Sequence, residues 1–274
     1  MVDQTQENEQ QEYMNTEKVP IWKSFGYAAS PALLYTALSS ACYSLFMEAG
    51  LANSQIVLQA ASVLVCLVFF AWRAKREGIA VKGVKKSVFR YPAVFCYVMA
   101  VVMCGLVNNY LFMILMSKTG KMSSDYWRVT EAFYNQELIM EILALCVIGP
   151  LAEELVYRGF VYQRLRSQTS EITAEVLSAL LFGVLHFNIV QGVYAFVLGL
   201  LLAHIVYKTG SLLAAAAAHM AANLVSVLWT ETDWLDFLNW NGVGRYAAAL
   251  LCVVLMAIFL SYGNRLMKNR TRKK

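Results

Sequence analysis

The chain has 274 residues, of which 59% are hydrophobic and 15% are charged, and its mean hydropathy is +0.50. A composition this apolar excludes an ordinary soluble domain of this length and predicts a membrane protein. Long apolar runs without alternation favour transmembrane helices over a barrel of strands. The net charge of +5 is distributed as an orientation signal, so we expect no nucleic-acid partner.

Three regions follow one another along the chain. Residues 1–24 are polar and rich in Glu and Gln, without the basic start and apolar middle of a cleavable signal peptide, so they predict a flexible cytoplasmic leader. Residues 25–263 predict an all-α transmembrane domain, a bundle of about eight helices around a central polar cavity, with the polar motifs at 138–229. Residues 264–274 predict a basic cytoplasmic tail.

The apolar runs give approximate boundaries for the spans, at about 20 residues each. The predicted spans are 25–47, 54–72, 92–117, 138–160, 172–190, 191–207, 211–229 and 245–263. The fifth and sixth are nearly fused through the sequence FNIVQG, which makes that boundary the least defined. All six cysteines lie within apolar runs and have no paired spacing, so we expect core residues and neither disulfides nor zinc ligands.

Lys and Arg residues orient the predicted helices, because they collect on the cytoplasmic side of a membrane. With an even number of spans and both termini inside, all but four of the 23 Lys and Arg residues fall in cytoplasmic segments. The four on the outside are Lys118, Lys121, Arg128 and Arg245. The sequence therefore predicts a multi-pass plasma-membrane protein with cytoplasmic termini, and its short outer loops and polar leader indicate a bacterial membrane.

The stretch VIGPLAEELVYRGF, 147–160, places three ionisable residues inside an apolar segment. Each such residue costs about 2.5–3.5 kcal/mol near the membrane centre on insertion scales, so it usually faces the bundle interior and has a function there. Glu154 and Arg158 are four residues apart and can form a structural ion pair. Glu153 points about 100° away from Glu154, which leaves it for general-base or proton-shuttle chemistry. Pro150 predicts that the helix kinks or opens nearby.

Two histidines have polar or aromatic partners at helix spacing. Phe182 and His186 share one helix face, and so do His219 and Asn223. At 1.5 Å of rise per residue, Glu153 and both histidines fall near the middle of a core about 30 Å thick. We therefore expect these side chains to share a cavity, although a purely structural polar network is the alternative.

Other polar residues of the predicted spans have simpler interpretations. His204 has no polar partner at helix spacing and is expected to be a satisfied packing residue. Asn108 and Asn109 either line the cavity or bond a neighbouring helix, and we favour the bond to a helix.

The order and spacing of three motifs resemble those of a known family. Glu153-Glu154-x-x-x-Arg158, Phe182-x-x-x-His186 and His219-x-x-x-Asn223 are similar to the motifs of the CPBP intramembrane proteases. This family includes the type II CAAX prenyl endopeptidases and bacterial proteins linked to bacteriocin processing and self-immunity. The resemblance covers roughly residues 140 to 228, with the stretch 207–224 similar to the usual approach to the third motif.

The resemblance implies an eight-helix protease whose catalytic cavity opens toward the cytosol. Glu153 would activate the attacking water, which His186 would help to hold. His219 and Asn223 would donate hydrogen bonds to the oxyanion of the tetrahedral intermediate. Supporting roles would fall to Glu154, Arg158 and Phe182. The implied substrate is a membrane-bound peptide or a lipidated protein.

The same residues leave the question of a metal open. Glu153, His186 and His219 form a chemically possible zinc set. The sequence has no H-E-x-x-H helix, however, and the asparagine after His219 suits an oxyanion site better than a ligand shell. We therefore prefer a glutamate-activated water without a cofactor.

Two other classes of function remain as alternatives. Glu, His and Arg inside a membrane also form proton relays, which would make the protein a proton-coupled transporter, but the chain shows no obvious internal repeat. The fold could also serve as a non-proteolytic immunity or scaffold protein.

Overall fold

The computed structural model describes residues 21–79, 90–119, 137–187, 189–238 and 241–268, and all regular structure within these ranges is helical. The first three helices are α2 (Ile21–Glu48), α3 (Gln55–Arg76) and α4 (Arg90–Thr119). A continuous helical run follows, in which three α-helical segments alternate with two π-helical ones. Its parts are α6 (Leu138–Glu141), the π-helix η1 (Ile142–Ile148), α7 (Gly149–Glu154), the π-helix η2 (Leu155–Val161) and α8 (Tyr162–Arg166).

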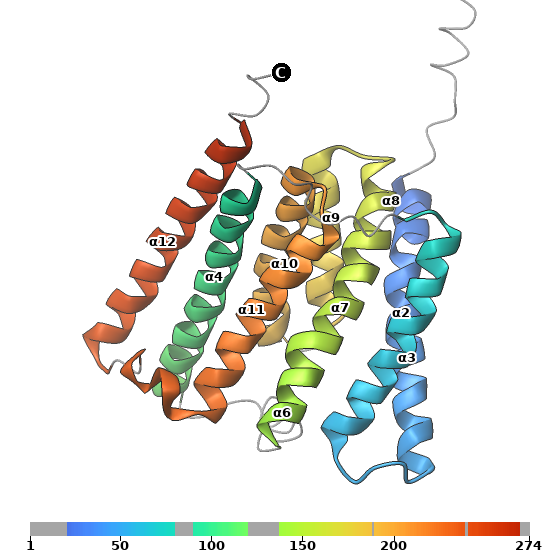
Figure 1. The fold of residues 1–274 in the computed structure, drawn as a ribbon, viewed down its shortest axis with the longest axis horizontal. Helices are drawn as coiled ribbons and strands as arrows, with labels where there is room; N and C mark the ends of the chain where they lie inside the picture. The colour runs from blue at the N-terminus through green and yellow to red at the C-terminus, as the bar shows by residue number, and fades with distance from the viewer. Residues whose placement is uncertain (1–20, 80–89, 120–136, 188, 239–240, 269–274) are drawn as a thin grey trace, which may run out of the picture.

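The last helices are α9 (Glu171–Val184), α10 (Ile189–Thr209), α11 (Leu212–Glu231), the short 3-10 helix η3 (Asp233–Leu238) and α12 (Val243–Lys268). Figure 1 shows that the long helices run up and down between two ends of one bundle. We call the end at which α2 begins and α12 finishes the terminal end. The opposite end, with the α2–α3 turn and η3, is the distal end.

Five of the described helices are long and apolar enough to cross a membrane. They are α3, α4, α10, α11 and α12. Each of the eight predicted spans contains helix, so the all-α fold and the multi-pass membrane character are confirmed, whereas the count of about eight crossings stays a prediction. Helix α9 has 14 residues and is therefore about 21 Å long, too short to cross a core of about 30 Å alone.

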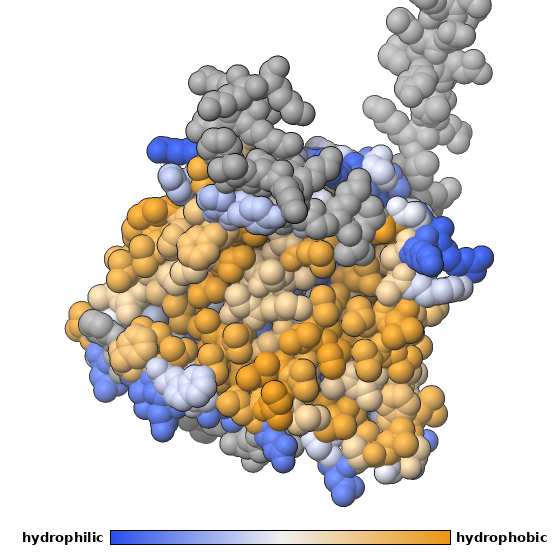
Figure 2. All heavy atoms as spheres, viewed as in Figure 1, coloured by the Kyte–Doolittle hydropathy of each residue, from blue (hydrophilic) through white to orange (hydrophobic). Residues whose placement is uncertain are grey.

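The surface of the bundle has the distribution expected of a protein in lipid. In Figure 2 apolar side chains cover the middle of the visible face, and hydrophilic side chains gather at its two ends. Large apolar residues such as Val68, Phe95 and Leu250 are more than 60% exposed. A soluble monomer rarely exposes so continuous an apolar surface.

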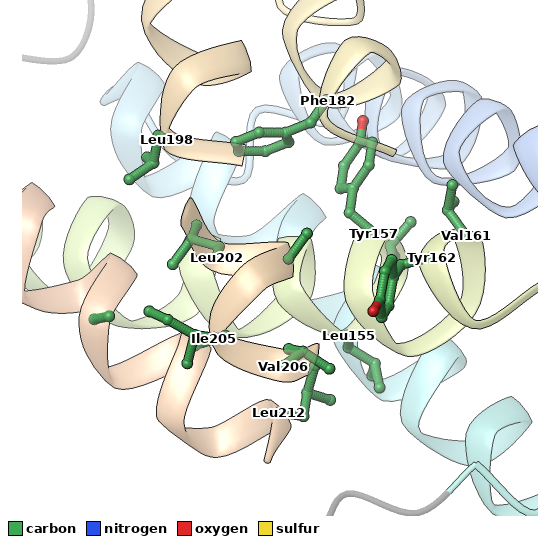
Figure 3. Packing of buried hydrophobic residues seen from close by; sticks show 14 of the residues in the cluster. Leu155, Tyr157, Val161, Tyr162, Phe182, Leu198, Leu202, Ile205, Val206 and Leu212 are labelled. Atoms are coloured by element: carbon green, nitrogen blue, oxygen red, sulfur yellow. The ribbon is translucent and has the colours of Figure 1, made fainter. Parts of the chain in front are cut away.

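The main core lies where η2, α9 and α10 meet. Phe160, Tyr162 and Leu202 are completely buried there, and Figure 3 shows Tyr157 beside Phe182 in the same cluster. The six cysteines are free, and five of them are buried, which confirms their assignment as core residues.

Arg164 fixes the end of this helical run to α2 and α3. Its guanidinium donates to the Tyr27 carbonyl at 3.1 Å and to Glu77 at 3.0 Å, and it lies 4.3 Å from the centre of the Tyr27 ring. Partial burial raises the pKa of Glu77, but hydrogen bonds from Arg73 and Arg164 outweigh this effect, so its pKa is lowered. These contacts hold α8 against α2 and the end of α3.

Glycines let α9 and α10 approach closely. A Cβ on Gly183 would lie 2.6 Å from the carbonyl oxygen of Gly192, and one on Gly199 would lie 3.0 Å from the Cα of Ala179. Small residues at such contacts are how membrane helices pack tightly. This contact matters for the site, because Phe182 stands beside Gly183.

Gly183→Ala is expected to destabilise the protein by about 1–3 kcal/mol, because the added methyl group must push the α10 backbone away. Denaturant unfolding in mixed micelles measures the change. Gly26→Ala is the matched control, since nothing lies within 4 Å of the Cβ position at Gly26. Equal stability of the two variants would show that the α9–α10 contact is not tight.

The structure corrects the boundary between the fifth and sixth predicted spans. Helix α9 ends at Val184 and α10 begins at Ile189, several residues before the predicted division at 190 and 191. The last turn tightens through a bond from the His186 N–H to the Gly183 carbonyl at 3.2 Å. Phe187 then adopts a φ of 53°, a left-handed conformation uncommon for an aromatic residue. The leader up to residue 20 and the tail beyond Lys268 lie outside the described residues.

Candidate active site

Pro150 opens the helix that carries the first motif, as predicted. A proline has no N–H, so residue 150 cannot serve the carbonyls of Cys146 or Leu145. The Gly149 N–H donates to the Ala144 carbonyl, five residues back. The Leu145 carbonyl instead accepts from Asn223 Nδ2 at 2.7 Å. The π-winding of η1 therefore ties the first motif to the third, and π-segments of this kind often occur at functional sites.

Glu154 stands at the centre of a buried charged network. Its Oε1 lies 3.0 Å from Arg158 Nη1, and both side chains are only 1% exposed. The same oxygen lies 3.0 Å from Nδ1 of His219. The predicted Glu154–Arg158 pair is thus present, and it also holds one nitrogen of the His219 ring.

Arg158 connects this network to the second motif. Its Nη2 donates to the Gly199 carbonyl at 3.3 Å, and its guanidinium carbon lies 4.6 Å from the centre of the Phe182 ring. A guanidinium over an aromatic face is attracted by the ring electrons. Phe182 in turn meets the rings of His186 and His219 edge to face, at 4.9 and 5.9 Å between centres. Phe182 therefore contacts the arginine and both histidines.

The hydrogen bond of His186 determines which of its nitrogens is free. Nδ1 lies 2.6 Å from the carbonyl oxygen of Phe182, and a carbonyl only accepts, so Nδ1 must carry a proton. In the neutral ring Nε2 is then an acceptor. This leaves an acceptor nitrogen that can hold a water molecule.

Glu153 is held more loosely than Glu154. Its Oε2 lies 3.8 Å from His219 Nε2, and its side chain is 24% exposed. A separation of 3.8 Å is too long for a hydrogen bond. The two neighbouring glutamates therefore differ as the sequence predicts, one enclosed in an ion pair and one facing open space.

The four predicted catalytic residues line one cavity of about 320 Å³. Glu153 comes from α7, His186 from the turn after α9, and His219 and Asn223 from α11. The expected shared cavity is thus found, while the catalytic role of each residue stays a prediction. The first and third motifs also share two direct contacts, His219 with Glu154 and Asn223 with Leu145.

The remaining polar residues of the core differ from one another. Asn108 and Asn109 both line the cavity, and Asn109 Oδ1 also accepts from the Ser226 hydroxyl at 3.4 Å, so both proposed interpretations apply. His204 lies outside the cavity walls and has partners on other helices. Its Nε2 lies 3.0 Å from Asn264 Oδ1 and its Nδ1 lies 3.6 Å from Glu175, which makes it a satisfied histidine.

The cavity extends from Glu153 toward the distal end of the bundle. Its walls include Asn109 near the end of α4, Gln191 near the start of α10 and Thr230 near the end of α11, and all three lie in the distal halves of their helices (Figure 1). Among the described basic residues outside the core, only Lys118 and Arg245 lie at that end. The cytoplasmic termini and the cavity open to the cytosol both stay predictions.

The described residues contain no group of three His, Cys, Asp or Glu side chains placed to hold a metal ion. Within the possible zinc set of Glu153, His186 and His219, each histidine uses its Nδ1 in a contact, with the Phe182 carbonyl or with Glu154. The described residues therefore give no support to a metalloprotease-like assignment, and the preference for a site without a cofactor stays a prediction.

Comparison with known proteins agrees with the three motifs. Residues 135–225 match the family model described as type II CAAX prenyl endopeptidase Rce1-like. This segment is similar to the Rce1-like domain. The match supports the assignment to the CPBP proteases and, at the level of the family, a CAAX-type intramembrane peptidase. It spans the run from α6 to most of α11 and leaves α2, α3, α4 and α12 outside. Neither a curated protein nor a solved structure matches the chain.

The sequence analysis did not predict a second cavity, which lies beside the segment that matches the family. It has a volume of about 350 Å³ and lies between α2, α3 and the turn after α9, with Glu153, Phe182 and His186 also in its wall. The signal was present in the first span, where Tyr35, Ser39 and Tyr43 recur every four residues in an otherwise apolar helix.

Proposed function

We propose that this protein is an intramembrane endopeptidase that hydrolyses a peptide bond of a membrane-held peptide or lipidated protein. The observation that carries the proposal is the difference between adjacent glutamates. Oε1 of Glu154 contacts both Arg158 and His219, while Glu153 faces a cavity with an acceptor nitrogen of His186 on its wall. A carboxylate of this kind can take a proton from water as a general base.

The proposed reaction begins with a water molecule between Glu153 and His186 Nε2. Glu153 removes a proton as the water oxygen attacks the peptide carbonyl, and His186 holds the attacking molecule through its free lone pair. Glu153 then passes the proton to the leaving nitrogen, which completes hydrolysis without a covalent enzyme intermediate.

The oxyanion of the tetrahedral intermediate needs hydrogen-bond donors. Asn223 has one N–H left after its bond to Leu145. His219 can donate from Nε2 when its ring is protonated at both nitrogens, since its Nδ1 is engaged by Glu154. Donors fixed in this way are effective because they need not reorganise during the reaction.

The substrate can be sought by comparing membrane proteomes of cells that carry the native chain or Glu153→Gln. The proposal predicts peptides whose new termini are present only with the native chain. Identical proteomes, combined with proton flux through native chains in liposomes, would instead favour a transporter. A phenotype that survives Glu153→Gln would favour a scaffold.

Chelation is expected to leave turnover unchanged. Preincubation of the reconstituted protein with 1,10-phenanthroline should not alter its cleavage rate, since the described donor groups do not form a three-ligand site. Loss of activity that zinc alone restores would contradict the metal-free mechanism.

A further inference from the structure

Helix α2 presents a face of hydroxyl groups to the second cavity. The cavity wall includes Tyr35, Thr36, Ser39, Ser40, Tyr43 and Ser44. Their positions repeat at intervals of four, which places them along one side of the helix. In a span whose other faces contact lipid and core, a continuous polar face is costly unless it has partners.

Ser39 is a nearly buried hydroxyl residue in the wall of this cavity. The residue is only 8% exposed, and among the described residues its side chain has no hydrogen-bond partner. A helical serine or threonine commonly bonds the carbonyl four residues back, as Thr36 does with Ala32 at 3.1 Å. A nearly buried hydroxyl without such a bond calls for a partner within the cavity.

Water is a partner that fits both the space and the chemistry. A cavity needs roughly 10–15 Å³ of accessible volume for each water molecule and two to four polar groups around it. The volume of about 350 Å³ therefore holds several molecules. Ser39, Ser40 and Gln59 offer donors and acceptors along it.

The second cavity meets the first at the predicted base. Glu153, Phe182 and His186 are common to both cavity walls. The wall of the first cavity carries four side-chain amides, which suit a peptide backbone, whereas that of the second carries one amide, Gln59, among seven hydroxyls. Each hydrolysis consumes one water molecule, and the surrounding hydrocarbon holds almost none.

We propose that the hydroxyl face of α2 holds and delivers the hydrolytic water to Glu153, while the substrate occupies the amide-lined cavity. The inference rests on the proposed peptidase function. It assigns a part of that function to α2, which lies outside the matched domain.

Two double variants of equal shape test the delivery of water. Valine and threonine differ mainly by a methyl group in place of a hydroxyl. Ser39→Val/Ser40→Val is expected to lower kcat at least about tenfold with KM within about twofold, whereas Ser39→Thr/Ser40→Thr stays near the native rate. A rise in KM at unchanged kcat would show that the cavity binds substrate. Identical kinetics of the two doubles would also overturn the proposal.

Thiol labelling tests the presence of water without relying on turnover or on the double variants. Ser39→Cys should react with a water-soluble methanethiosulfonate faster than the native chain, whose own cysteines are buried except for Cys42. A rate equal to that of the native chain would overturn the proposal. Labelling of Ser39→Cys in a chain whose native form cleaves no substrate would contradict the peptidase function and leave the hydrated cavity supported.

Discussion

Glu153→Gln should lower the rate of peptide hydrolysis by about 10²- to 10⁴-fold, the usual contribution of a positioned general base. Glutamine keeps the shape of the side chain but cannot take a proton from water. The fold should be unaffected, because the Glu153 carboxylate lies 3.8 Å from His219 Nε2, too far for a hydrogen bond. The measurement is the turnover rate of the reconstituted protein at saturating substrate, together with its unfolding midpoint.

The matched control for this variant is Glu48→Gln. Glu48 is an exposed glutamate at the end of α2, outside both described cavities, so the same chemical change there should leave turnover at the native rate. Undiminished cleavage by Glu153→Gln would remove Glu153 from the mechanism. If turnover fell equally in both variants, the loss of activity would not be specific to Glu153.

Arg158→Met should destabilise the protein by about 3–5 kcal/mol, because it leaves the Glu154 carboxylate buried without its cation. The variant also loses the bond to Gly199 and the contact with the Phe182 ring. The free energy of unfolding in mixed micelles measures the loss. A decrease in the free energy of unfolding below about 1 kcal/mol would show that the Glu154–Arg158 pair stabilises the protein no more than an exposed ion pair does.

A double variant separates the charge from the packing. Glu154→Gln/Arg158→Met removes both charges, and the new amide oxygen can still accept from His219. We expect the double variant to regain part of the stability lost in Arg158→Met, since a buried pair is costly to break and cheaper to replace as a whole. A double variant no more stable than the single one would contradict the ion-pair account.

The sequence could predict the helices because lipid leaves the backbone few choices. Every N–H and C=O in the membrane core must be satisfied within the chain, so each long apolar run predicts a helix. The separation of roles between Glu153 and Glu154 was predictable for a similar reason. Neighbours on a helix diverge in direction, and a partner four residues along is in reach.

Contacts between distant segments could not be predicted in this way. The sequence alone shows that Pro150 has no N–H to donate. Only the fold shows that Asn223 donates a hydrogen bond to the Leu145 carbonyl instead. The attachment of His219 to Glu154 likewise depends on how α11 packs against α7. The extent of the cavity depends on side chains from several helices at once, so no single motif could define it.

The most direct test of a glutamate-activated water is hydrolysis in water enriched in ¹⁸O. The reconstituted native protein would cleave a membrane-anchored peptide in the presence of a chelator, and mass spectrometry would examine the new carboxyl terminus. We predict a product that carries one heavy oxygen, and no such product with Glu153→Gln. An unlabelled product, cleavage that requires added zinc, or equal product from both proteins would contradict the mechanism.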